Sequence, residues 1–489
     1  MSVVVRRMAE DAEVAKAPGI TQWIPLPYGA FRTFLRDPLA FQLDARERFG
    51  DVFRFRVGPL LVHFLYHPDY VRHVLHDQQK NYLRGWHYRL LQRLLGDNLV
   101  VSEGDYWMRQ RRLAQPAFLR ARLTGYAEVM VDATSQMLAR WRGIAAAGEP
   151  IDIGAEMSRV ALAIAGRTLF SRDVSNEADA VGQTFSLIGG YLVQRIHHPF
   201  TSLPGWVPTP TNLRFQRAVR TLNEIVLGLI RDRRREGRDH GDLLSMLLQA
   251  RDEETSAAMS DEQLRSEVLT FLLAGHETTA TALTWTWYFL ASHAPVQEWV
   301  REEVVAVLGG RLPTLADVLH LNRARMVIEE AMRLCPPVWA VTRQVVRDDE
   351  IGGYHIPARS TVILCPFVTH RHPEFWEHPD DFDPERFTPE RVAQRARGAY
   401  FPFLSGPHQC IGNEFAMLEM RLIVAMVLRE FDVALLPGQS IQPRGSLTLR
   451  PGGPVQTALQ SRGKADTQNK PVELSATAVG PPQQSHLRV

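Results

Sequence analysis

One cysteine stands where its sulfur could bind a metal. Cys410 follows the turn-forming pair Gly406-Pro407 and lies just ahead of Asn413–Leu428, which is apolar at helical spacing. The amide N–H groups and positive dipole end of such a helix favour the thiolate over the thiol, and such a thiolate is a good axial ligand for haem iron. Gly412 removes a side chain where a large flat group could approach the backbone. A lone cysteine is more often a small buried hydrophobic residue, so the surrounding pattern must decide.

The residues from Phe403 to Gly412 read Phe-x-x-Gly-x-His-x-Cys-x-Gly. This pattern resembles the haem-binding signature of the cytochrome P450 family, and the resemblance covers residues 20–460. It departs from the family at Leu404, where a small or polar residue is usual. The resemblance implies haem b as cofactor and Cys410 as iron ligand, with Phe403, His408 and Gly412 beside the haem.

A second motif lies inside a long apolar segment, Leu264–His293. A membrane span is one interpretation, but charged residues such as Arg265 and Glu267 interrupt the segment and favour a buried central helix. Its hexapeptide Ala274-Gly275-His276-Glu277-Thr278-Thr279 is rich in poor helix formers. It resembles the family's oxygen-activation motif, in which the helix widens locally and makes room for dioxygen and water.

The resemblance assigns roles within this motif. Ala274 and Gly275 would border the oxygen, Thr278 would donate a hydrogen bond during oxygen activation, and Glu277 would help to relay protons to the distal oxygen atom. The alternative for Thr278 is a hydrogen bond back to a carbonyl of its own helix.

An acid and a base share one face of the expected helix Leu321–Leu334, at Glu330 and Arg333. Such pairs are usually solvated and contribute little. Here the pattern resembles the family's Glu-x-x-Arg helix, and Arg386 in Asp383–Phe387 resembles its partner motif. The resemblance implies a buried, mutually neutralised charge network of structural rather than catalytic importance, which fixes the loop that carries Cys410.

Haem propionates require cations and hydrogen-bond donors. Trp107 and Arg111 are four residues apart and share one helix face. The pattern resembles the family's propionate-binding helix, and Arg343 and His408 occupy the other matching positions. Any of these residues considered alone would be read as a surface group.

Electrons must come from a separate protein, because the sequence has neither a Gly-rich dinucleotide fingerprint nor a flavin domain after Gly412. The resemblance implies an acidic ferredoxin or flavodoxin, supplied by a reductase and NAD(P)H. The residues that would attract it by electrostatic steering are arginines near Trp107: Arg109, Arg112, Arg120 and Arg122. The alternative is a solvated basic face.

Composition excludes several partners and compartments. The formal net charge of +2 over 489 residues gives no sign of a nucleic-acid partner. Three cysteines are too few for a disulfide framework and favour a reducing compartment. The first 19 residues lack the apolar core of a signal peptide or membrane anchor. We expect a soluble, cytoplasmic monomer.

The chain divides into a flexible leader (1–19), one haem domain (20–460) and a disordered polar tail (461–489). Asp51–Phe55 and Leu60–Tyr66 predict a hairpin, and Thr361–Leu364 a strand. Further helices are predicted over Thr124–Ala147, Met157–Phe170, Ala178–Ile196 and Leu213–Arg235. The resemblance implies a mainly α fold, a triangular helical prism with a smaller β-rich region.

The function implied is monooxygenation of a hydrophobic substrate with dioxygen, two electrons and two protons. Apolar stretches that would line the pocket favour fatty acids, terpenes or other lipophilic metabolites. One alternative is a peroxide-driven haem-thiolate peroxygenase, although such enzymes generally lack the pair Glu277 and Thr278. Another is a non-catalytic haem sensor, which needs no proton relay.

Overall fold

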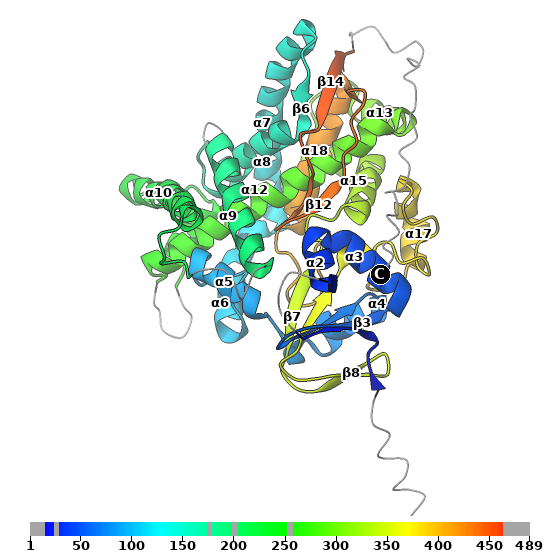
Figure 1. Ribbon diagram of the computed structural model, residues 1–489. Coiled ribbons are helices and arrows are strands. Elements are labelled where there is room, and N and C mark those ends of the chain that lie inside the picture. Colours follow the sequence, from blue (N-terminus) through cyan, green and yellow to red (C-terminus); the bar gives the residue numbers. More distant parts are fainter. Residues whose placement is uncertain (1–14, 24–28, 174–177, 198–203, 252–257, 463–489) are drawn as a thin grey trace, which may run out of the picture. The chain divides into compact units, whose positions relative to one another are not determined.

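The computed structural model describes residues 15–23, 29–173, 178–197, 204–251 and 258–462 (Figure 1). Its chain forms two compact units. The first comprises Met1–Arg89, Trp339–Pro379 and Arg395–Gln409, and the second comprises Leu90–Val338, Asp380–Gln394 and Cys410–Val489. The predicted tail falls almost entirely outside the described residues.

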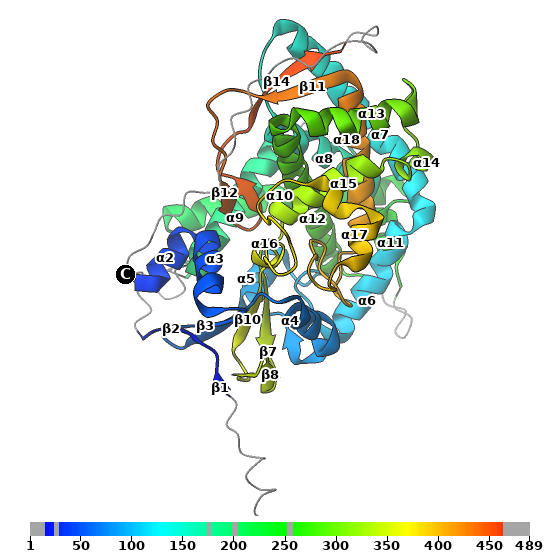
Figure 2. The same cartoon turned by 90° about the vertical axis from the view of Figure 1, so that its right-hand side faces the viewer.

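The first unit is built on a six-stranded sheet in the order β2-β3-β4-β10-β7-β5, part of which is labelled in Figure 2. Its strands are β2 (Gly19–Gln22), β3 (Val52–Val57), β4 (Leu60–Leu65), β10 (Thr361–Leu364), β7 (Val341–Val345) and β5 (Tyr82–Leu83). The predicted hairpin is β3–β4, whose antiparallel register closes at Val57 and Leu60. Gly58 takes a positive φ of 54° in the turn.

Residues 15–19 of the expected leader belong to the fold instead. Strand β1 (Ala15–Lys16) pairs in parallel with β9 (Tyr354–Ile356), which also pairs with β8 (Asp349–Ile351). Side-chain packing explains this difference, since Ala17 is buried. The remaining elements of this unit are α2 (Gly29–Arg36), α3 (Pro38–Phe49), α4 (Pro68–Arg72), η1 (His73–Asp77), η2 (Gln79–Asn81) and α16 (Pro366–Thr369).

The second unit is mainly helical, as predicted, with a small β region. Its helices up to α12 are α5 (Trp86–Leu95, which begins in the first unit), α6 (Gly104–Ala114), η3 (Gln115–Phe118), α7 (Arg120–Ala147), α8 (Ile153–Leu169), α9 (Ala178–His197), α10 (Pro210–Glu236), α11 (Leu243–Gln249) and α12 (Asp261–Ser292). They continue with α13 (Ala294–Leu308), α14 (Leu315–Val318), α15 (Asn322–Leu334), η5 (Pro384–Phe387), α17 (Pro389–Gln394) and α18 (Asn413–Glu430). Its strands are β6 (Ile151–Asp152), β11 (Phe431–Leu435) and β14 (Gln456–Ser461) in one sheet, with β12 (Pro443–Gly445) and β13 (Leu449–Pro451) in a ribbon.

Helix α12 is the predicted central helix and runs through the second unit beside α8 (Figure 1). A capping box between Ser260 and Gln263 starts it. Most of its 32 residues are buried on all sides, including Trp285 and Trp287. No helix among the described residues combines the length and the apolar character that crossing a membrane requires.

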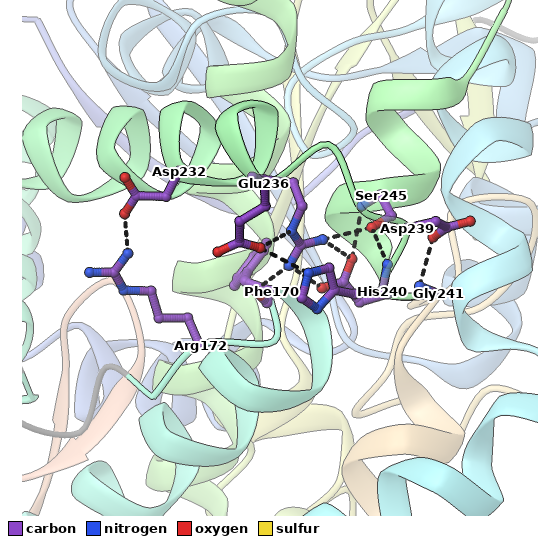
Figure 3. Close-up of polar contacts among 10 residues, drawn as sticks. Phe170, Arg172, Asp232, Glu236, Asp239, His240, Gly241 and Ser245 are labelled. Carbon is purple, nitrogen blue, oxygen red and sulfur yellow. Dashed lines mark hydrogen bonds and ion pairs between the residues drawn. The ribbon is translucent and has the colours of Figure 1, made fainter.

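A buried ion pair fastens the end of α10 to its neighbours, in the region drawn in Figure 3. The Arg233 guanidinium donates to both Asp242 oxygens, at 2.6 and 2.7 Å, and to Ser245 Oγ at 2.6 Å. It also donates to the Phe170 carbonyl at the end of α8, at 2.8 Å. Because Asp242 caps α11, one guanidinium links three helices.

Replacing Arg233 by methionine should lower the free energy of unfolding by about 3–5 kcal/mol, because Asp242 would remain buried and charged without its partner. Replacing Asp242 by leucine in the same chain should recover much of that loss. Urea unfolding at equilibrium measures both effects. The exposed neighbour Arg231→Met is the control, and an equal loss there would contradict this account.

Candidate active site

Cys410 lies two residues before Gly412, which precedes the first residue of α18. Its side chain is exposed, whereas Cys335 and Cys365 are buried, so the Cys410 sulfur borders an open space. Desolvation by the surrounding protein raises the pKa of the Cys410 thiol. The Gly412 N–H and the Arg111 guanidinium act in the opposite direction and stabilise the thiolate.

Two of the residues predicted to bind propionates, Trp107 and Arg111, lie on α6, and both are half-buried. They are four residues apart and therefore share one helix face. Burial lowers the pKa of Arg111, and the charge of Cys410 opposes that change. Helix α6 thus carries a cation, Arg111, and an indole hydrogen-bond donor, Trp107. The charge of Arg111 also favours the Cys410 thiolate.

The oxygen-activation motif interrupts the burial of α12. Ala274 is exposed, and Gly275 and Thr278 are half-buried, whereas His276 and Glu277 are buried. The Thr278 hydroxyl donates to the Ala274 carbonyl at 2.7 Å, which is the alternative hydrogen bond expected from the sequence. Ala274 and Thr278 therefore face an open space from the middle of a buried helix.

One aromatic ring connects this helix to the segment after Cys410. Phe118 stacks on Phe271 of α12, with ring centroids 5.7 Å apart, and meets Phe415 of α18 edge-on at 6.4 Å. A Cβ atom at Gly412 would lie 3.7 Å from the Phe118 ring. An exposed thiol, an open helix face and half-buried donors suit a flat macrocycle with anionic side groups, so these residues fit haem.

The Glu277 carboxylate is bound by two side chains near β13. Its Oε1 accepts from Thr448 Oγ1 at 2.8 Å and from Arg450 Nε at 2.5 Å. A second Arg450 nitrogen lies 2.5 Å from the same oxygen. Sequence reasoning did not identify Arg450. The available signal was the acid itself, because a buried mid-helix carboxylate requires a nearby cation.

The residues of the expected charge network come together in the second unit. Arg333 donates to both Glu330 oxygens, at 2.7 and 2.8 Å, and both side chains have no exposed surface. Arg386 Nε lies 3.4 Å from Glu330 Oε1, which also accepts from the Asp383 N–H at 2.9 Å. Burial raises the pKa of Glu330, and the pairing with Arg333 acts against that rise.

The other predicted haem contacts belong to the first unit. Phe403 and His408 are half-buried, and Arg343 is buried in β7, where it donates to the Thr342 carbonyl at 2.9 Å. Leu404, which departs from the family pattern, has a positive φ of 58°. Such a backbone is strained for leucine, so the departure carries a conformational cost.

Glu267 is a further ionisable residue of α12 to which sequence reasoning gave no role. The residue is 1% exposed, and its Oε2 accepts from the Leu99 N–H at 3.3 Å. Burial raises the pKa of Glu267 to about 8. The carboxyl is therefore neutral at pH 7, unlike an ordinary glutamate.

Changing Glu330 to glutamine should cost about 3–5 kcal/mol of stability, because Arg333 would stay buried without its counter-charge. The exposed acid Glu302→Gln serves as the control and should change stability by less than about 0.5 kcal/mol. Urea unfolding measures both. A loss below 1 kcal/mol for the Glu330 variant would show that the network is not needed for stability.

Glu267→Gln should change how stability depends on pH. The folded-state pKa of about 8 exceeds the ordinary value of 4.5, so the folded chain holds this proton more tightly between the two values. Its contribution to stability is full below pH 4.5 and is lost as the pH rises towards 8. The neutral variant should therefore gain about 2–3 kcal/mol over the parent between pH 5.5 and 7.5. Urea unfolding of the parent and the variant across this pH range measures the difference. The exposed Glu262→Gln is the control. Parallel plots of stability against pH for the parent and Glu267→Gln would contradict this account.

Comparison with known proteins places this site in a family. The family model described as Cytochrome P450 matches residues 24–457. Two proteins of Streptomyces melanosporofaciens are similar: cyclooctatin synthase, 37% identical over 85% of this chain and 90% of its own, and cyclooctat-9-en-7-ol 5-monooxygenase, 35% identical over 87% and 90%. A solved cyanobacterial P450 with bound retinoic acid is 27% identical and superimposes with a TM-score of 0.81, covering 92% of this chain and all of its own. The chain therefore belongs to the cytochrome P450 family and is a haem-b monooxygenase with the predicted P450 fold.

Proposed function

We propose that this monooxygenase hydroxylates a terpene. The similar bacterial proteins are named for cyclooctatin and cyclooctat-9-en-7-ol, and the similar solved structure holds retinoic acid. These named compounds are lipophilic isoprenoids, which favours terpenes over fatty acids in the predicted substrate range. Apolar residues of the second unit, among them Phe271 and Leu447, belong to one hydrophobic cluster and suit such a substrate.

The observation that carries this proposal is the exposed Cys410 sulfur in the same unit as the open face of α12. Haem iron bound there supplies the activation of dioxygen. Cys410 would hold the iron, and Trp107 and Arg111, together with Arg343 and His408, would bind the propionates. Phe403 and Gly412 would pack beside the ring.

Four polar or small residues of α12 would serve the chemistry. Ala274 and Gly275 leave room beside the helix, and Thr278 would exchange its present bond to the Ala274 carbonyl for a bond to the oxygen substrate. Glu277 would supply protons. Glu330, Arg333 and Arg386 would hold the Cys410 loop in place by their mutual charge pairing.

We propose that a ferredoxin or flavodoxin docks on the surface formed by α6 and the start of α7. Arg112, Arg120 and Arg122 are exposed there, and Arg109 is half-exposed. Met108 and Leu119 expose 48% and 53% of their surface among them. An apolar centre with a basic rim suits a small acidic redox protein, whose association such charges accelerate.

The remaining expectations are also proposals. A monomer in the cytoplasm agrees with three free cysteines, two of them buried. A peroxide-driven peroxygenase and a haem sensor remain the alternatives. Peroxide-driven enzymes generally lack the adjacent acid and threonine found here as Glu277 and Thr278, and a sensor needs no relay of protons, so these two residues argue for oxygen activation.

The reduced, CO-bound protein should show the red-shifted Soret band of a thiolate ligand, and Cys410→Ser should lose both this band and turnover, since serine cannot supply the sulfur. The buried cysteine Cys335→Ser should keep both and is the control. Terpenes should shift the Soret band more than fatty acids of similar size do. Turnover with peroxide alone at the rate of the reconstituted redox system would instead favour the peroxygenase.

A further inference from the structure

A cavity of about 800 Å³ lies on the side of α12 that carries Glu277, within the second unit. The start of α8, part of α9, α12 and the loop between β13 and β14 form its walls. The polar residues among them are Asp152, Ser158, Glu277, Thr281, Thr284 and Arg450. Carboxylate, hydroxyl and guanidinium groups together make this space suitable for water.

The cavity and the open face of the oxygen-activation motif occupy neighbouring sides of α12. Glu277, Thr281 and Thr284 share the cavity side, because they stand at helical spacings of four and three residues. Thr278 follows Glu277 and is therefore turned by roughly 100° around the helix axis. Glu277 thus stands at the border between a polar cavity and the side of α12 that carries Thr278.

The backbone that carries Arg450 is tied directly to α12. The Trp285 indole donates to the Leu449 carbonyl at 2.7 Å, one residue before Arg450. Arg450 also stands opposite Arg444 in the β12–β13 ribbon. These contacts fix the strand, so the guanidinium reaches Glu277 from a defined direction.

Arg450 and Thr448 both bind the same oxygen of Glu277, Oε1. The Glu277 side chain is 8% exposed, and the Arg450 side chain is 31% exposed. A half-buried arginine therefore supplies the charge that a buried carboxylate requires, and two of its nitrogens hold one oxygen of that carboxylate, Oε1, in place.

We propose that Arg450 is a positioning residue for proton delivery, which holds Glu277 at the inner wall of the cavity so that cavity water supplies the protons of the reaction. This inference rests on the proposed role of Glu277 in monooxygenation. The reaction consumes the substrate C–H bond, one dioxygen, two electrons and two protons, and it yields the alcohol and one water. Each proton passes from cavity water to Glu277 and then towards the Thr278 side, which returns Glu277 to the carboxylate that Arg450 binds.

Arg450→Gln tests the proposal in the holoenzyme with its redox partners. Product formed per NAD(P)H consumed should fall by roughly tenfold or more, the scale of a weakened general acid, and the solvent isotope effect on turnover should rise. The substrate dissociation constant from the Soret shift should stay unchanged, because Arg450 lies on the cavity side. Arg450→Lys should recover part of the loss, since it restores the charge without the fork. Arg444→Gln is the matched control and should resemble the parent.

Blocking the cavity provides a second, independent test. Ala155 is an exposed residue of α8 that lines the cavity, so Ala155→Phe should narrow the space without touching Glu277. It should lower the product yield and raise the solvent isotope effect in the same direction as Arg450→Gln. Ala146→Phe, at an exposed position of α7, is its control.

Several results would overturn the proposal. Parental product yield and isotope effect in Arg450→Gln would remove the role of Arg450, and an equal loss in Arg444→Gln would show a general effect of the ribbon. A changed substrate affinity in Ala155→Phe would assign the cavity to substrate instead. Should Arg450→Gln fail to fold, Thr448→Val removes one bond to the same oxygen and must reproduce the direction of the effect. Absence of the thiolate–CO band in the parent would refute the proposed function itself, independently of these variants.

Discussion

The structure of the second unit depends on how α12 carries ionisable side chains through a buried core. Each such group must be paired, hydrogen-bonded or neutral, because an isolated charge there would be too costly. Glu267 is neutral at pH 7, since burial raises its pKa to about 8. His276 contacts Ser158 Oγ at 2.8 Å and is neutral as well, because burial lowers its pKa to about 4. Glu277 is paired with Arg450.

Glu267, His276 and Glu277 differ in their suitability for proton transfer. A neutral buried carboxyl such as Glu267 holds its proton, and a neutral imidazole such as His276 accepts one only at low pH. Of the three residues, Glu277 is the one that lines the polar cavity, and Arg450 holds its carboxylate there. This position, next to Thr278, is why we propose Glu277 rather than Glu267 or His276 for proton transfer.

Local patterns predicted individual elements of the fold and supplied the candidate site residues, whereas contacts between distant residues were beyond them. The hairpin β3–β4 and helix α12 follow from turn residues and apolar spacing in short windows. Helix α10 begins at Pro210, three residues before the predicted start, although Thr209 and Pro210 form a recognisable N-terminal cap. The partner of Glu277 lies 173 residues further along the chain. Sequence spacing carries no information on such a pair, so Arg450 could be found only from the folded chain.

A monooxygenase of lipophilic substrates has to bring protons into a site that otherwise excludes water. Apolar surface favours binding of the substrate, but the exclusion of water also removes the source of protons. Free access of water would raise the low dielectric constant of the site. Helix α12 offers a way to meet both demands. Two consecutive residues, Glu277 and Thr278, lie on different sides of the helix, and these sides have different surroundings. Glu277 faces the polar cavity, and Ala274 and Thr278 face the other side. In the role we propose, the buried Glu277 carboxylate passes protons across this border without admitting water, and Arg450 keeps it in place.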